Sequence, residues 1–147
     1  MLIRTNSEHP DFRYLVSLLD QDLTIRDGED HAFYDQFNKI DSIKHAVVAY
    51  LDEIPVGCGA IKQYEDGVAE LKRMYVKEDY RRKGVASAVL KELEEWAKEL
   101  NYSSLILETG KAQPEAIALY ERKAFSVIPN YGQYAGVENS VCMKKAI

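Results

Sequence analysis

The chain has 147 residues, the size of a single domain with room for a buried core. Hydrophobic residues make up 46% and charged residues 29%, the composition of an ordinary globular protein. The net charge of -5 argues against a nucleic-acid partner, because it gives no basic field over the whole surface. We therefore expect one domain over residues 1–147.

The sequence shows neither an export signal nor a membrane span. The first residues lack the apolar run of a signal peptide, and no stretch approaches transmembrane length, so we expect a cytoplasmic protein with no membrane partner. Cys58 and Cys142 lie in apolar, strand-like contexts, which favours small buried hydrophobic residues over a disulfide. No His, Cys and Asp cluster has metal-ligand spacing, which predicts no metal.

The chain begins with the pattern of one strand and two helices. Leu2–Thr5 reads as a short strand. Asn6 and Ser7 are residue types that begin helices. The apolar residues that follow with helical spacing are Phe12, Leu15, Val16, Leu18 and Leu19. After a break at Asp27–Asp30, His31–Phe37 predicts a shorter helix with an aromatic face.

Three strands follow, joined by two short turns. His45–Leu51 is strongly apolar, and Ile54–Tyr64 returns after Asp52 and Glu53. A hairpin signal then leads into Val68–Val76, where apolar and polar side chains alternate. This alternation predicts that Leu71, Arg73 and Tyr75 share one face of the strand. We expect the three strands to form an antiparallel meander.

The second half of the chain predicts a crossover and a closing hairpin. From Val85 to Leu100 the apolar spacing becomes helical, and a strand follows at Leu105–Thr109, which favours a parallel pair with Val68–Val76. A second helix begins at Pro114. Phe125–Ile128 and Asn139–Lys144 read as the last two strands, so the fold class is α+β.

A basic, glycine-containing turn lies between the strand Val68–Val76 and the helix that begins at Val85. The first-turn N–H groups of a helix have no helical partners, and the helix dipole places positive potential there, so this turn is suited to an anion. Positive charge is concentrated around it, which fits a small polyanionic ligand. The basic residues concerned are Lys72, Arg73, Lys77, Arg81, Arg82 and Lys83.

Two motifs resemble those of the GCN5-related N-acetyltransferase (GNAT) superfamily. Arg81-x-x-Gly84-x-Ala86 is similar to the Q/R-x-x-G-x-G/A signature that cradles the pyrophosphate of acetyl-CoA. Ala116 to Phe125 is similar to the family's A-x-x-L-Y-x-x-x-G-F motif, with Tyr120 at its tyrosine. The chain departs at Ala124, where glycine is usual, and at Gln113, where asparagine is frequent.

The resemblance implies a fold and a cosubstrate. The fold is a mixed, mostly antiparallel sheet of about seven strands with helices on both faces, in which the fourth and fifth strands are parallel and splay apart near a bulge. The cosubstrate is acetyl-CoA, its pantetheine arm lying on the backbone of the fourth strand, with the Met74 N–H as an oxyanion donor. The implied cofactor-binding residues are Met74, Tyr75, Val76, Arg81, Arg82, Lys83, Gly84, Val85, Ala86, Ser87 and Gln113.

Tyr120 and Glu70 are the candidate catalytic residues. A phenol with a pKa near 10 stays protonated at neutral pH and can protonate a leaving thiolate, whose conjugate acid has a pKa of roughly 8.5. An amine with a pKa near 10.4 is only about one part in a thousand neutral near pH 7.4, so a base must take its proton. Glu70 lies four residues before Met74, the spacing of the general base in the histone-acetylating branch of the superfamily. The alternative is a solvated carboxylate, or one paired with Lys62 or Lys72.

The acceptor side is less defined in the sequence. An anionic, aromatic rim would suit a cationic amine, although tyrosines are also common packing residues. The candidate substrate-binding residues are Tyr64, Tyr80, Tyr131, Tyr134 and Glu138. We expect an acetyl-CoA-dependent N-acetyltransferase acting on a small-molecule amine by direct attack. The alternatives are a protein lysine or N-terminus as acceptor, and a non-catalytic acyl-CoA sensor; a homodimer through the last strands is also open.

Overall fold

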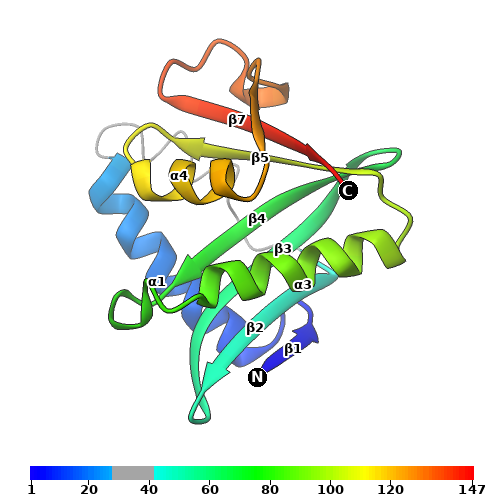
Figure 1. Ribbon diagram of the computed structural model, residues 1–147. Coiled ribbons are helices and arrows are strands. Elements are labelled where there is room, and N and C mark those ends of the chain that lie inside the picture. The colour runs from blue at the N-terminus through cyan, green and yellow to red at the C-terminus, as the bar shows by residue number, and fades with distance from the viewer. Residues whose placement is uncertain (28–41) are drawn as a thin grey trace.

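The computed structural model describes residues 1–27 and 42–147. In these residues seven strands form one sheet in the order β1-β2-β3-β4-β5-β7-β6 (Figure 1). The strands are β1 (Leu2–Thr5), β2 (His45–Leu51), β3 (Ile54–Glu65), β4 (Val68–Val76), β5 (Ser104–Gly110), β6 (Ser126–Ile128) and β7 (Ser140–Ala146). The helices are α1 (Pro10–Asp27), α3 (Val85–Glu99) and α4 (Pro114–Arg122), with short 3-10 turns η2 (Glu78–Tyr80) and η3 (Gly132–Tyr134). The predicted helix at 31–37 lies outside the described residues.

The helices cover both faces of the sheet, as expected. In Figure 1, α3 crosses in front of β2, β3 and β4, and α1 lies behind them. The core on the α3 face includes Val89 and Leu93 of α3 and extends to Tyr120 of α4. The core on the other face gathers around Phe12, Leu15 and other buried residues of α1. The α+β prediction is confirmed, and the only parallel strand pair among the described residues is β4 with β5.

A β-bulge in β4 changes the faces that its side chains occupy. The register with β3 shifts between Cys58 and Ala60, and Arg73, opposite this shift, has a φ of 60°. The extra residue reverses the alternation. Leu71 packs into the core on the α3 face, whereas Tyr75 packs on the α1 face. The predicted shared face for Leu71, Arg73 and Tyr75 is therefore wrong, although the bulge that the family resemblance implied is present.

The parallel strands β4 and β5 separate soon after they meet. They pair only from Val68 to Glu70 on β4, opposite Ser104 to Ile106 on β5. Beyond Glu70, this edge of β4 has no strand partner among the described residues. The antiparallel partner of β5 is β7, which lies between β5 and β6 in the sheet. The splay leaves room between the carboxyl ends of β4 and β5.

The first helix begins later than the sequence suggested. Asn6 accepts a hydrogen bond from the Glu8 N–H, and His9 Nδ1 accepts one from the Asp11 N–H, so these residues form the turn before the helix. The helix starts at Pro10, where a missing N–H does no harm. Cys58 and Cys142 are both buried and free, as expected. In the described part of the chain, no helix combines the length and apolar character needed to cross a membrane.

Candidate active site

Two adjoining cavities lie where β4 and β5 separate. The larger, of about 480 Å³, extends from the end of β4 over the turn that enters α3 to the outer side of α4. The smaller, of about 110 Å³, lies between Glu70 and Arg73 on β4, Glu108 on β5 and Tyr134. Five residues line both cavities, and they mark the boundary between them. These are Leu19, Met74, Gln113, Ala116 and Tyr120.

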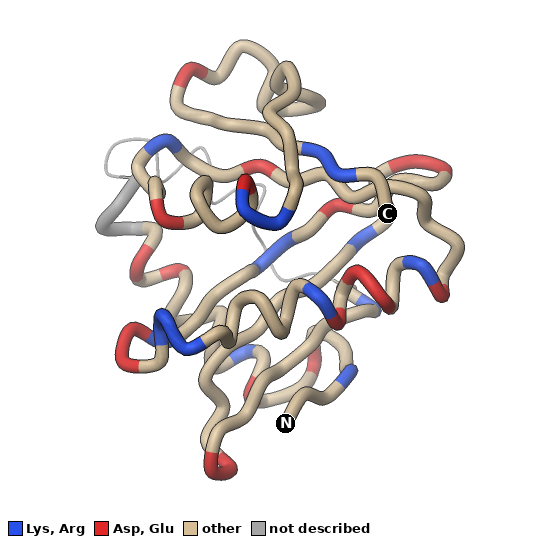
Figure 2. The backbone as a smooth tube through the Cα atoms, in the orientation of Figure 1, with Lys and Arg blue, Asp and Glu red and all other residues tan. Residues whose placement is uncertain are grey.

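The larger cavity collects the residues that the sequence motifs singled out for the cofactor. Every one of them lines it except Lys83, whose ammonium group lies 5.6 Å from the centre of the Tyr80 ring. Figure 2 shows basic positions gathered on the turn between β4 and α3, at one end of this cavity. Arg122, in the last turn of α4, also lines it and was not predicted. The cavity therefore combines an apolar groove with a basic end.

The turn into α3 has the backbone geometry of an anion cradle. Arg82 has a φ of 64° and Gly84 a φ of 81°, both in the left-handed region. Gly84 is the N-cap of α3 and has no side chain with which to cap the first-turn N–H groups, which suits them to bind an anion. An added Cβ at Gly84 would meet no protein atom within 4 Å. Its backbone conformation, rather than crowding by protein atoms, is therefore the local reason for glycine.

Arg81 is partly engaged by the protein itself. Its Nε donates to the Val76 carbonyl at 2.9 Å, its Nη2 lies 4.0 Å from Asp22, and its guanidinium lies 5.6 Å from the centre of the Tyr75 ring. These contacts fasten the turn to the end of β4. Arg81 thus has a structural role beside any phosphate contact, while Arg82 is exposed at the cavity.

Tyr120 lies on the wall that the two cavities share. The residue is buried, and its ring packs edge-on against Phe125 with centroids 5.5 Å apart. No hydrogen bond joins its hydroxyl to another described residue. Burial raises the pKa of the phenol above its ordinary value of 10. Tyr120 is therefore a protonated phenol at neutral pH, next to both cavities.

Glu70 lies in the smaller cavity with two partners. Its Oε2 accepts a hydrogen bond from the Tyr131 hydroxyl at 2.6 Å, and its Oε1 lies 3.4 Å from the Lys72 ammonium. The carboxylate is almost fully buried. The pairing with Lys72 considered from the sequence is present. Burial raises the pKa of Tyr131, and the negative charge of Glu70 and the hydrogen bond to it raise the pKa further.

The other residues proposed for the acceptor side do not all line the smaller cavity. Tyr134 is buried and lines the smaller cavity, and burial raises its pKa. Tyr64 packs edge-on against Tyr131 at 5.1 Å between ring centroids, one layer further out. Tyr80 lines the larger cavity rather than the smaller one. Glu138 is exposed in the loop before β7 and lines neither cavity.

Two charged residues of the smaller cavity were missed as site residues. Arg73 was read only as part of the basic cluster around the turn, yet its side chain is buried and lines the smaller cavity. Glu108 of β5 lines the same cavity. The bulge brings Arg73 here, and strand alternation alone contains no signal for it. In residues 1–27 and 42–147, no three His, Cys, Asp or Glu side chains are grouped so as to hold a metal ion.

Comparisons with known proteins identify the family. The acetyltransferase (GNAT) family matches residues 11–125, so the chain belongs to this family and the predicted resemblance is confirmed. The chain is 37% identical over 93 residues to the "IAA acetyltransferase" of Azospirillum brasilense, across 63% of this chain and 61% of that protein. The match thus spans about three fifths of the relative's length.

Solved structures share the whole architecture. A protein from Klebsiella pneumoniae subsp. pneumoniae MGH 78578, provisionally assigned as an acyl-CoA N-acyltransferase, has a TM-score of 0.80 at 28% identity and covers 99% of this chain and 97% of its own. A provisionally assigned streptothricin acetyltransferase from Bacillus anthracis str. Ames was solved with acetyl coenzyme A. Its TM-score is 0.63 at 21% identity, over 76% of this chain and 67% of that one, which indicates a shared fold.

Proposed function

We propose that this protein is an acetyl-CoA-dependent N-acetyltransferase that acetylates a primary amine of a small molecule by direct attack on the thioester. The observation that carries the proposal is the position of Tyr120. It lies on the wall between a cavity with a phosphate cradle and a cavity with a buried carboxylate, Glu70. A thioester at this boundary would have a proton donor beside its sulfur and a proton acceptor beside its attacking amine.

The larger cavity suits the shape and charge of a coenzyme A chain. The N–H groups at the start of α3, with the exposed Arg82, would hold the pyrophosphate. The backbone of Met74 and Val76 lies on the free edge of β4, where an extended pantetheine arm can add like a strand. The Met74 N–H is the proposed oxyanion donor, a role usually worth several kcal/mol.

The proposed reaction needs one bond to form and one to break. The neutral amine nitrogen bonds to the thioester carbonyl carbon, and the C–S bond then breaks. Glu70 takes the proton that the amine loses, directly or through water, and Tyr120 gives its proton to the leaving thiolate. The proton that Glu70 holds then passes to the Tyr120 phenolate. Both residues thereby return to the states in which they began.

An acetylated cysteine intermediate is not needed. Cys58 is fully buried in β3, donates to the Arg73 carbonyl at 3.3 Å, and lines neither cavity. Burial raises the pKa of its thiol to about 12, which leaves almost no thiolate at neutral pH. Cys142 is also buried, and burial raises its pKa too. Both thiols are therefore poor nucleophiles.

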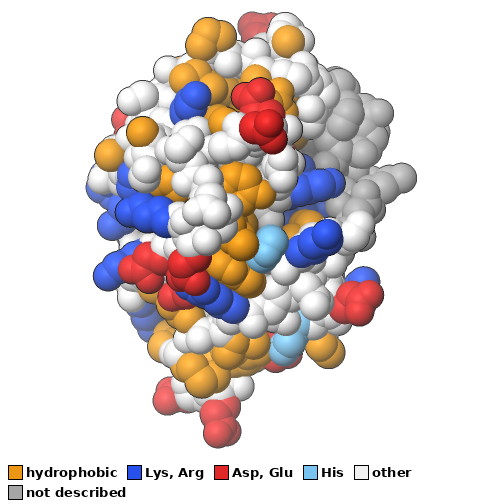
Figure 3. Space-filling view, turned by 90° about the vertical axis from the view of Figure 1, so that its right-hand side faces the viewer, with side chains coloured by type: hydrophobic (Ala, Val, Ile, Leu, Met, Phe, Trp, Pro, Cys, Tyr) orange, Lys and Arg blue, Asp and Glu red, His pale blue; other side chains and the backbone are white. Residues whose placement is uncertain are grey.

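A small acceptor fits the observed surface and cavity. The net charge of -5 gives no overall basic field, and on the face in Figure 3 acidic and basic side chains are interspersed. The smaller cavity, about 110 Å³, has room for a small polar group. The names of the two relatives given above denote different acceptors, IAA and streptothricin, so family membership alone leaves the acceptor open.

The test measures thiol release from acetyl-CoA with a panel of small amines. We expect amine-dependent release from the wild type. We expect Tyr120→Phe to lower kcat by about 10- to 100-fold with little change in the KM for acetyl-CoA, because the lost proton acts only as sulfur leaves. Tyr102→Phe, on the turn after α3, is the matched control. A wild-type kcat in Tyr120→Phe would remove Tyr120 from the mechanism. Tight CoA binding by the wild type without amine-dependent thiol release would favour a non-catalytic sensor and overturn the proposal.

A further inference from the structure

Arg73 is the buried charge in the smaller cavity whose bonding is incomplete. Only 2% of its side chain is exposed, and Nη1 donates a hydrogen bond to Asp20 of α1 at 3.1 Å. Nε and Nη2 are buried and have no hydrogen-bond partner among the described residues. Arg73 is one of the residues that line the smaller cavity, as Glu70 is.

This arrangement is costly for the fold. A buried donor without a partner destabilises a fold, and it does so more when the group is charged. The left-handed φ of 60° at Arg73 adds strain that a non-glycine residue ordinarily avoids. Asp20, whose side chain is 44% exposed, accounts for one guanidinium nitrogen only. A ligand that bonds to the remaining donors would explain why such a residue is kept in the cavity.

The free edge of the guanidinium limits the chemistry of that ligand. Nε–H and one N–H of Nη2 point the same way, and this two-donor edge matches the two oxygens of a carboxylate. The phosphate cradle lies at the other end, beyond Met74 and past the end of β4, so the diphosphate of the cosubstrate is already provided for. The anion at Arg73 would therefore belong to the acceptor.

Glu70 and Arg73 together present opposite charges to one small cavity. They lie three residues apart on β4, a span of roughly 10 Å between Cα atoms in an extended strand. An amine facing Glu70 and a carboxylate facing Arg73 would complement both ends. We propose that the acceptor is a small amine that also carries a carboxylate, which the Nε and Nη2 edge of Arg73 binds; this rests on the proposed function above.

The first test needs only the wild-type enzyme. Small amino acids are each compared with their carboxamides, which keep the size and the amine but lose the negative charge. We expect kcat/KM to be about 10- to 100-fold higher for the acids, the factor that a hydrogen bond to a charged group supplies. The amine of a carboxamide is the less basic one and is more often neutral at a given pH. A preference for the acids therefore cannot come from amine basicity.

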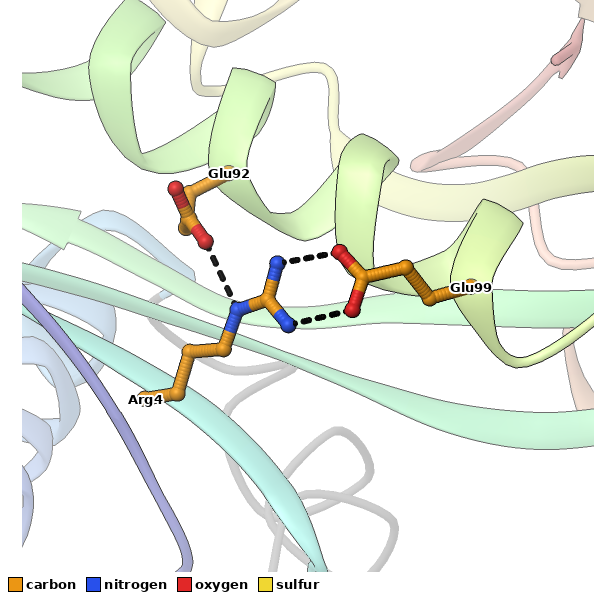
Figure 4. Close-up of polar contacts among 3 residues, drawn as sticks. All are labelled: Arg4, Glu92 and Glu99. Carbon is orange, nitrogen blue, oxygen red and sulfur yellow. Dashed lines mark hydrogen bonds and ion pairs between the residues drawn. The ribbon is translucent and has the colours of Figure 1, made fainter.

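The second test assigns that preference to Arg73. We expect Arg73→Gln to lower the ratio of acid to carboxamide to about one, with the KM for acetyl-CoA unchanged. Arg73→Lys, which keeps the charge but loses the two-donor edge, should give an intermediate ratio. Arg4→Gln is the matched control, since Arg4 of β1 pairs with Glu92 and Glu99 of α3, none of which lines either cavity (Figure 4). It should keep the wild-type ratio.

The outcomes separate this inference from the proposed function. Equal kcat/KM for acids and carboxamides in the wild type would overturn the inference while the acetyltransferase stands, and this holds even if Arg73→Gln does not fold. An equal loss for acids and carboxamides in Arg73→Gln would show that Arg73 does not recognise the carboxylate, which also overturns it. No amine-dependent thiol release with any amine would overturn the proposed function, and the inference with it.

Discussion

At the scale of single residues, the contacts of Glu70 decide how it can act. Its carboxylate is held by the Tyr131 hydroxyl at 2.6 Å and faces the Lys72 ammonium at 3.4 Å. Both partners fix the orientation of the carboxylate in the cavity. A proton acceptor that is oriented before the amine arrives is what direct attack requires.

We therefore expect Glu70→Gln to lose activity in a pH-dependent way. At neutral pH the loss in kcat/KM should be about 100-fold or more, the usual contribution of a general base. As the pH rises toward the pKa of the amine, more of the substrate is already neutral, so the loss should shrink. Rates measured from pH 6 to pH 10 test this, with Glu65→Gln at the exposed end of β3 as the control. A variant profile that parallels the wild type would leave Glu70 with a structural role only.

At the residue scale, the sequence pointed to positions at the cavities where a motif carried the position. Tyr120 and Gly84 stand in patterned stretches, and the structure places Tyr120 on the wall that the two cavities share and Gly84 at the larger one. The contact between Tyr131 and Glu70 joins residues 61 positions apart, and no local pattern encodes it. Arg73 was missed as a site residue because a single extra residue in β4 turns its side chain from the expected face.

At the scale of elements, the turn between β4 and α3 combines strain with function. Arg82 and Gly84 both have left-handed φ, and an L-residue there costs about 1–2 kcal/mol. Ala124 shows that this chain tolerates such strain, since it has a φ of 71° after α4, where the family motif usually has glycine. Gly84 differs from Ala124 in that it also lines the larger cavity.

We expect Gly84→Glu to abolish CoA binding while the protein stays folded. The added carboxylate would stand at the cradle and repel phosphate, so the Kd for CoA should rise at least about 100-fold, measured by calorimetry. Gly136→Glu is the matched control, because Gly136 has a φ of 77°, open space around it and no place in either cavity lining. Both variants should lose similar stability. Equal Kd values for the two variants would mean that the cradle does not bind the phosphates.

Element order and strand pairing were largely readable from the sequence. The hairpin between β3 and β4 and the start of α4 at Pro114 agree with their local signals. The start of α1 was placed too early, because Asn6 uses its side chain in a turn before the helix. The position of β7 between β5 and β6 could not be read, since strand order depends on contacts between distant segments.

At the scale of the whole molecule, close packing disfavours ionisation of the buried phenols and thiols. Burial raises the pKa of Tyr120, Tyr131, Tyr134 and Cys58. Burial and the hydrogen bond to Asp11 at 2.5 Å raise the pKa of Tyr50 to about 12. In the unfolded chain the thiol would ionise near pH 8.5 and the phenols near pH 10. The folded state thus keeps protons that the unfolded state releases.

The sign of the effect follows from linkage. Because the unfolded chain binds fewer protons above about pH 8, the free energy of unfolding must fall as the pH rises from about 8 to about 12. A fully buried group such as Cys58 contributes a slope of up to about 1.4 kcal/mol per pH unit in that range. Below about pH 8 these groups are mostly protonated in both states, so they add little pH dependence there.

We therefore expect the free energy of unfolding, measured by urea unfolding, to be nearly level from pH 7 to about 8 as far as these groups are concerned. Above about pH 8 it should begin to fall, and it should fall most steeply above about pH 10. Tyr50→Phe should be less stable at neutral pH, because the hydrogen bond to Asp11 is lost, but should show a shallower fall between pH 10 and 12. Tyr102→Phe is again the control and should keep the wild-type slope. If Tyr50→Phe keeps that slope as well, the Tyr50 phenol ionises in the folded protein as easily as in the unfolded chain, and its bond to Asp11 does not hold the proton in place.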